Sequence, residues 1–341
     1  MTDSKHPSPP SENRIEVVDC LRGIAVLSVC ISHFMAANCG LAADSFIRQV
    51  GTHGWLGVEI FFVISGFIIP YSLHRSGYKL SDYPKFLLKR VLRLDPPYLL
   101  AVLLAIVVGW LAAQSSAYRG APYQVSIPQV LLHLAYVNTF FGYDWVNAVF
   151  WTLAIEFQYY LAVGLLLPLI AHHSLAVRVA LGCGLGALAV LLPEHRFIFH
   201  WLFLFMLGML AFHWHAKLAG RRELGFGLAL LGGGAWFTLG PLQASVGVAT
   251  ALAIALVRFK ARPLVFLGMI SYSLYLIHVP IGAKLVNLGG RYVTGTLTSL
   301  ALIAAALGVS ILCAWALYFC VERPAQRWSS KVKYRASPSP D

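Results

Sequence analysis

The chain has 341 residues, of which 58% are hydrophobic and only 12% charged, and its mean hydropathy is +0.71. This composition excludes an ordinary soluble globular domain and is typical of a protein that crosses a membrane many times. The net charge of +12 is spread over segments that flank apolar runs, so it indicates orientation in a membrane and not nucleic-acid binding.

Apolar runs of about 17 to 25 residues predict ten transmembrane helices. In chain order they cover residues 17–38, 52–73, 86–113, 147–171, 175–193, 196–216, 223–240, 243–258, 265–285 and 296–320. Only short breaks separate the fifth from the sixth and the seventh from the eighth, so merged or re-entrant pairs remain open. The predicted fold is therefore an all-α, polytopic bundle in the lipid bilayer.

The positions of the cations orient this bundle. With the N-terminus in the cytoplasm, all but five of the 26 Lys and Arg residues fall in cytoplasmic segments; the exceptions are Arg48, Arg119, Arg196, Lys284 and Arg291. This split follows the positive-inside rule and predicts that both termini are cytoplasmic. We interpret residues 1–13 as a disordered polar tail, residues 14–322 as the transmembrane domain and residues 323–341 as a basic tail near anionic lipid.

The first apolar segment carries ionisable side chains on one stripe. Arg22 and His33 are eleven positions apart, which returns to nearly the same helix face after a rise of about 16 Å. Asp19 lies near the same stripe. Charged groups inside a span are costly and are candidates for function, although Asp19 and Arg22 also suit interfacial anchors and His33 a bundle histidine.

The third segment begins with a cluster of four cations in nine positions, Lys85, Lys89, Arg90 and Arg93. Arg90 and Arg93 share one helix face at spacing i and i+3. A pair of planar guanidinium groups suits a phosphate better than a lone lysine does, while arginines at the inner end of a span are also ordinary topology anchors. The pair is a candidate site for a cytoplasmic molecule that carries phosphate.

Two carboxylates lie inside other segments. Glu59 in the second span and Glu156 in the fourth are both expected about 10 Å below the outer surface, near the level of His33. Each could be a packed acid without further role, but a carboxylate is also the usual partner that orients a catalytic histidine.

The ninth segment adds another polar stripe, since Ser271, Tyr275 and His278 follow at i, i+4 and i+7. Interhelical hydrogen bonding is one explanation for it, and a place in the site is the other. The six cysteines show no Cys-x-x-Cys pair and no interleaved His ligands, so we expect no disulfide framework and no metal site.

Together, these segments resemble the membrane acyltransferase 3 family. The resemblance rests on Asp19-x-x-Arg22-Gly23, the Arg22 to His33 spacing, GVEIFFVISGF at 57–67, Arg90-x-x-Arg93, Trp151-Thr-Leu-x-x-Glu156, SYSLYLIH at 271–278 and Glu322-Arg-Pro. It implies a ten-helix enzyme of the bacterial inner membrane that moves an acyl group, most often acetyl, from cytoplasmic acyl-CoA to a hydroxyl of a cell-surface or exported glycan. It also implies that His33 is the essential histidine and that Arg90 and Arg93 are the family's arginine pair.

The residues and the resemblance lead to one hypothesis, a membrane O-acyltransferase with acyl-CoA as co-substrate and no bound cofactor. His33 is its predicted general base, oriented by Glu156 or Glu59, and an acyl-histidine intermediate stays open. Arg22, Arg90 and Arg93 are expected to bind acyl-CoA. Supporting or acceptor-binding roles are assigned to Asp19, Ser271, Tyr275, His278 and Trp151.

The acceptor expected for this enzyme is a glycan, a lipid-linked sugar or a smaller lipophilic alcohol. Two alternatives use the same buried charges differently. One is a transporter of a small anion or lipid-linked sugar, and the other is a non-catalytic membrane subunit of a glycan assembly complex.

Overall fold

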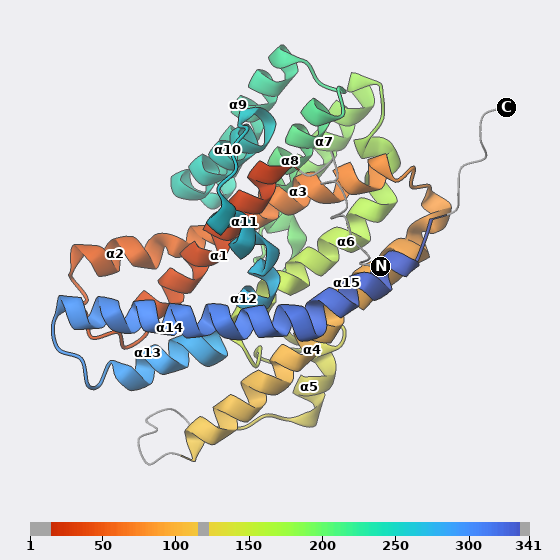
Figure 1. The fold of residues 1–341 in the computed structure, drawn as a ribbon. Helices are drawn as coiled ribbons and strands as arrows, with labels where there is room; N and C mark the ends of the chain where they lie inside the picture. Colours follow the sequence, from red (N-terminus) through yellow and green to blue (C-terminus); the bar gives the residue numbers. More distant parts are fainter. Residues whose placement is uncertain (1–14, 115–122, 335–341) are drawn as a thin grey trace, which may run out of the picture.

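A computed structural model of the protein describes residues 15–114 and 123–334, and every regular element within these ranges is helical (Figure 1). The predicted tail 1–13 lies outside the described residues. The first elements are α1 (Glu16–Ala36), α2 (Phe46–Thr52), η1 (His53–Leu56), α3 (Gly57–Arg75), η2 (Leu80–Asp82), α4 (Tyr83–Ala113), α5 (Ile127–His133), η3 (Asn138–Phe141), η4 (Ala148–Phe150) and α6 (Trp151–Ile170). They are followed by α7 (Leu175–Leu191), α8 (Ile198–His215), α9 (Arg221–Leu239), α10 (Pro241–Leu256), α11 (Arg262–Met269), α12 (Ser271–Ile277), η5 (His278–Ala283), α13 (Lys284–Gly289), α14 (Thr296–Leu317), η6 (Tyr318–Glu322) and α15 (Arg323–Lys331).

All ten predicted apolar segments fold as helices, so the all-helical prediction is confirmed for the described residues. Length and apolar composition support fewer membrane spans. Within the described ranges, six helices are long and apolar enough to cross a membrane, or seven if the bent pair of α11 with α12 to α13 forms one span. Helices α7 and α10 are apolar but only 17 and 16 residues long. The count of ten spans and the cytoplasmic termini therefore stay predictions.

The predicted ninth span is broken in its first third. Helix α11 ends at Met269, and the helical stretch that begins at Ser271 is bent away from it by 61°. The polar stripe that follows the break meets other helices, since Ser271 contacts Arg22 of α1 and Tyr275 contacts Thr152 of α6. A sequence pattern of continuous hydrophobicity does not reveal such a bend.

Two glycines let α11 approach the first half of α1 very closely. A Cβ atom on Gly23 would collide with the backbone carbonyl of Leu264. A Cβ atom on Gly268 would likewise collide with the carbonyl of Asp19. Small residues at a helix contact permit this backbone approach, which brings the start of α12 beside α1.

Two large clusters of buried hydrophobic side chains, beside a small third one at Leu210, Leu224 and Ala255, stabilise the bundle. The larger cluster joins α3, α6 and α8 and includes Phe67, Tyr159 and Phe205. The second cluster lies around α1, α12 and α14 and includes Phe34 and Leu274. Val58 of α3 and Phe157 of α6 pack against both clusters, so these two helices form the boundary between them.

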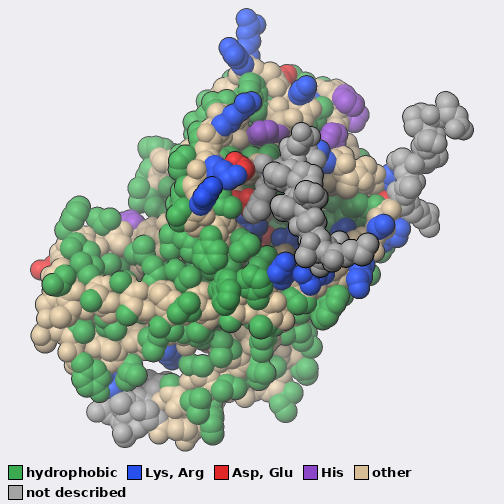
Figure 2. Space-filling view, in the orientation of Figure 1, with side chains coloured by type: hydrophobic (Ala, Val, Ile, Leu, Met, Phe, Trp, Pro, Cys, Tyr) green, Lys and Arg blue, Asp and Glu red, His purple; other side chains and the backbone are tan. Residues whose placement is uncertain are grey.

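The basic C-terminal segment begins inside a helix. Helix α14 continues through the π-helical segment η6 into α15, so that residues 296–331 form one helical stretch. Helix α15 packs on α4, where Ser329 Oγ donates a hydrogen bond to the Lys89 carbonyl at 2.8 Å. Figure 2 shows Lys and Arg side chains gathered over the upper and right parts of one face, while hydrophobic side chains cover most of the rest.

Candidate active site

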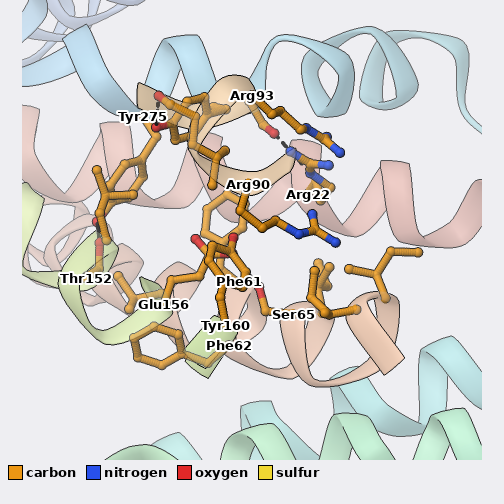
Figure 3. A pocket seen from close by; sticks show the side chains of 18 of the residues that line it. Arg22, Phe61, Phe62, Ser65, Arg90, Arg93, Thr152, Glu156, Tyr160 and Tyr275 are labelled. Carbon is orange, nitrogen blue, oxygen red and sulfur yellow. Dashed lines mark hydrogen bonds between the residues drawn. The ribbon is translucent and has the colours of Figure 1, made fainter. Parts of the chain in front are cut away.

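The first of two neighbouring cavities lies between α1, α3, α4, α6 and α12, with a volume of about 160 Å³. We call it the arginine cavity because Arg22, Arg90 and Arg93 line it (Figure 3). In Figure 3 these arginines lie at one end, and Thr152 and Tyr275 lie at the opposite end. The other polar side chains of its wall are Ser65, Ser72, Glu156, Tyr160, Ser271, Tyr272 and Glu322.

Arg90 and Arg93 of α4 and Arg22 of α1 line the same cavity, so one ligand could contact all three. The Arg90 guanidinium carbon lies 5.2 Å from the ring centroid of Phe86 and 5.3 Å from that of Tyr160. Its Nε atom is buried and has no hydrogen-bond partner within the described residues. Arg22 Nε donates a hydrogen bond to Ser271 Oγ at 3.2 Å.

Two carboxylates line the same cavity but are held by neutral donors. Glu156 accepts a hydrogen bond from Ser65 Oγ at 2.8 Å. Glu322 accepts one from Ser273 Oγ at 2.6 Å and another from Gln326 at 3.0 Å. Within the described ranges, no ion pair joins either carboxylate to the three arginines. Buried cations need an opposite charge or hydrogen bonds to compensate them, so an anion is the ligand that suits these three guanidinium groups.

The second cavity adjoins the arginine cavity and has a volume of about 370 Å³. We call it the histidine cavity because His33, His195 and His200 line it. Its wall comes from α1, η1, α3, η4, the start of α6, α8, the adjoining ends of α9 and α10, and α12. The remaining lining residues include Trp55, Glu59, Trp151, Trp201, Thr238 and Gln243.

A backbone carbonyl fixes the orientation of His33. The Nδ1 atom of this ring lies 3.1 Å from the carbonyl oxygen of Val29, one helical turn earlier. Because a carbonyl only accepts hydrogen bonds, this contact assigns the proton of the neutral ring to Nδ1. The Nε2 atom is then left with a lone pair, as a general base requires.

The two predicted carboxylate partners of His33 occupy different cavities. Glu59 shares the histidine cavity with His33; it is buried, and its Oε2 atom has no hydrogen-bond partner in the described part of the chain. Glu156 lines the arginine cavity instead. No hydrogen bond between described residues joins either carboxylate to His33, and the Val29 carbonyl occupies the orienting position. An orienting role thus remains a prediction for Glu59, whereas Glu156 is placed with the arginines.

Two other predicted residues lie beside the cavities without lining either one. The ring of His278 meets that of His33 edge to face at a centroid distance of 5.0 Å. Its Nδ1 contacts the Tyr275 carbonyl at 2.7 Å, and its Nε2 is buried without a partner among the described residues. Asp19 lies in the first turn of α1, at the contact with α11.

Trp151, a predicted acceptor residue, belongs to an aromatic wall of the histidine cavity. Its ring centroid lies 5.3 Å from that of Trp201 of α8. His195 and His200 stand next to this wall with ring centroids 3.9 Å apart. The sequence did not indicate the two histidines or Trp201, because they surround a short break between two apolar runs and show no spacing that predicts a site. Glu322 was visible only as part of the Glu322-Arg-Pro motif.

The two cavities share two lining residues, Val58 and Tyr275. The Tyr275 hydroxyl lies 2.6 Å from Thr152 Oγ1 and donates to the Val149 carbonyl at 3.2 Å. The Tyr275 ring also packs edge to face on Phe61 at a centroid distance of 5.9 Å. This boundary therefore ties α12 to α3 and to the start of α6.

Comparison with known proteins gives one family for nearly the whole chain. The model of a family described as an acyltransferase domain, acyltransferase 3, matches residues 15–319. An acetyltransferase-named protein, ORF330, of Acidianus two-tailed virus is 29% identical over 52% of this chain and 49% of its own length. Acyltransferase MdmB of Streptomyces mycarofaciens is 27% identical over 54% of this chain and 46% of its own length.

A third relative, protein 2 in the picA locus of Rhizobium radiobacter, is 33% identical over 28% of this chain and 46% of its own length. The chain thus spans about half the length of the curated relatives that it matches. No solved structure gives a significant match.

Proposed function

This chain belongs to the acyltransferase 3 family, and we propose that it is a membrane enzyme that transfers an acyl group from acyl-CoA to a hydroxyl. The observation that carries this proposal is the adjacency of two unlike cavities with a common boundary. One offers three arginines to an anionic donor, and the other offers a histidine with a free lone pair to a hydroxyl.

The arginine cavity is the proposed donor site. Acyl-CoA is anionic at its nucleotide end and neutral along its pantetheine arm. Its phosphates suit the guanidinium groups of Arg90 and Arg93, which α4 presents to this cavity. Arg22 of α1 adds a third guanidinium group. Helix α1 is continuous between Arg22 and His33, so the neutral arm has about 16 Å to cover along it.

The proposed chemistry is general-base catalysis at His33. Its Nε2 accepts the proton of the acceptor hydroxyl while the oxygen attacks the thioester carbonyl. The tetrahedral intermediate then collapses, the carbon–sulfur bond breaks, and the proton on His33 passes to the leaving CoA thiolate. An acyl group carried first by His33 gives the same products and remains an alternative route.

The histidine cavity is the proposed acceptor site. Tryptophan faces and polar groups such as those of Gln243 and Thr238 suit a sugar, which presents apolar ring faces and hydroxyl groups together. In the orientation that the positions of the cations predict, this cavity faces the outside of the membrane. The expected acceptor is therefore a glycan, a lipid-linked sugar or a smaller lipophilic alcohol at the bacterial inner membrane.

Reconstitution of the protein in liposomes tests the proposal directly. Acetyl-CoA labelled on the acetyl group is supplied on one side and a panel of lipid-linked sugars on the other, and both free CoA and acylated product are measured. We expect CoA release that depends on an acceptor and is lost in His33→Ala but retained in His173→Ala, an exposed histidine outside both cavities. Movement of sugar or anion without acyl transfer would instead establish a carrier.

A further inference from the structure

The boundary between the two cavities is the part of the wall that the proposed donor and acceptor sites have in common. Tyr275 and Val58 line both cavities, whereas the arginines line only one and His33 lines only the other. If phosphates lie at the arginines and the hydroxyl lies at His33, the thioester must meet the hydroxyl where these two side chains stand. They are therefore the residues that an acyl chain has to pass.

Hydrogen bonds fix the Tyr275 hydroxyl at this boundary. Its hydroxyl and that of Thr152 lie 2.6 Å apart, and both lie within reach of the Val149 carbonyl, at 3.2 and 3.0 Å. Two hydroxyl groups supply two protons for these three contacts, so one hydroxyl donates to the carbonyl and the other donates to its neighbour. Thr152 lines the arginine cavity and Val149 the histidine cavity, so this triangle lies across the boundary.

We propose that Tyr275, held by Thr152 and facing Val58, is a partition that separates the donor and acceptor cavities and limits the length of the acyl group that is transferred. The proposal rests on the proposed function. The partition keeps water on the acceptor side from the thioester, since hydrolysis of acyl-CoA to free acid and CoA is the side reaction that a closed site prevents. Tyr275 acts here through the space that its ring fills.

A labelling experiment tests the partition without any need for catalysis. Ile68 lines only the arginine cavity and is partly exposed there. In a variant whose native cysteines are replaced, Ile68→Cys should react with a small membrane-impermeant methanethiosulfonate from one side of the vesicle only. Adding Tyr275→Ala should make it reactive from both sides, while Tyr275→Phe, which keeps the ring, should leave it reactive from one side. Reaction from both sides before any change at Tyr275 would overturn the proposal.

An activity experiment tests the consequence for the donor. In Tyr275→Ala and Val58→Ala, kcat/KM for propionyl-CoA relative to acetyl-CoA should rise by roughly tenfold, because the two acyl groups differ by one methylene and one methylene in a pocket is worth roughly that factor or more. Release of free acid without an acceptor should rise as well. Tyr159→Ala removes an equally buried tyrosine that lines neither cavity and should change neither ratio.

The outcomes separate the two proposals. Acceptor-dependent transfer by the wild-type protein, together with an unchanged donor preference and unchanged free acid in folded Tyr275→Ala, overturns the partition and leaves the proposed function intact. Absence of any acyl-CoA turnover by the wild-type protein overturns the proposed function, and the labelling experiment then still decides whether Tyr275 separates the cavities.

Discussion

The arginine cavity and the histidine cavity differ in the charge and the type of the side chains that line them. The arginine cavity concentrates charge, with three guanidinium groups and two carboxylates that accept hydrogen bonds from neutral donors. The histidine cavity is lined by tryptophans and histidines, with Glu59 as its one carboxylate among the described residues. A site for an anion and a site for a neutral hydroxyl compound need opposite environments, so a transferase benefits from keeping them apart and joining them at one boundary.

The separation of the donor and acceptor sites is tested most strongly by substitution of His33, for which we expect the largest loss of activity. His33→Ala should lower the rate of acyl transfer by about a hundredfold or more, since that is the usual contribution of a general base. Acyl-CoA affinity should stay near normal, because the arginines line the other cavity. Steady-state transfer and equilibrium binding of acyl-CoA measure the two quantities.

Replacement by glutamine sharpens the same test. His33→Gln should be no better than His33→Ala, because an amide group forms hydrogen bonds but cannot take the proton. A folded variant that transfers at more than about a tenth of the wild-type rate would contradict the role of general base.

The second effect concerns the donor end. Arg90→Ala or Arg93→Ala should raise the Kd for acyl-CoA by about ten- to a hundredfold, corresponding to the roughly 1.5–3 kcal/mol of a hydrogen bond to a charged group. Arg93→Lys should be intermediate, because an ammonium group keeps the charge but not the two-pronged geometry. Isothermal titration with acyl-CoA gives the values.

Arg196→Ala is the matched control for the arginines, since this exposed residue pairs with Glu194 and lines neither cavity. Unchanged acyl-CoA affinity in both Arg90→Ala and Arg93→Ala would show that the pair only anchors α4. The arginine cavity would then need another explanation.

A smaller effect is expected at the acceptor end. Trp151→Ala removes one ring of the aromatic wall and should raise KM for the acceptor by about three- to tenfold, in line with roughly 0.5–1.5 kcal/mol for one aromatic contact. KM for acyl-CoA should not move. Trp315→Ala, an exposed tryptophan of α14, is the control, and an equal rise in both KM values would argue against separate sites.

The smallest effect is expected at the start of α12. Ser271→Ala removes the hydrogen bond that positions Arg22 and should weaken acyl-CoA binding by about fivefold, for roughly 1 kcal/mol. Ser310→Ala removes a buried hydroxyl that lines neither cavity, and binding there should be unchanged. Loss of thermal stability without loss of affinity in Ser271→Ala would assign Ser271 to helix packing alone.

The two glutamates show where sequence reasoning reached its limit. The expected second span begins at residue 52, whereas the apolar helical stretch of the structure begins at Phe46, so Glu59 lies about 20 Å along it. Glu156 lies about 7.5 Å from the start of α6 at Trp151. Helix boundaries are the least certain part of a hydrophobicity pattern, so depths counted from them did not show that the two carboxylates line different cavities.

The sequence by itself determined the helical fold, the family and the stripe that links Arg22 to His33, because apolar runs and helical spacing are properties of each segment alone. Tertiary structure decided which stripes meet. Gly23 and Gly268 allow α11 to approach α1 closely, and the chain bends after Met269, so that Ser271 lies beside Arg22. The contact of Tyr275 in α12 with Thr152 in α6 places Tyr275 between the cavities. These contacts join residues more than a hundred positions apart, and no periodicity within one helix encodes the helix face that it will meet.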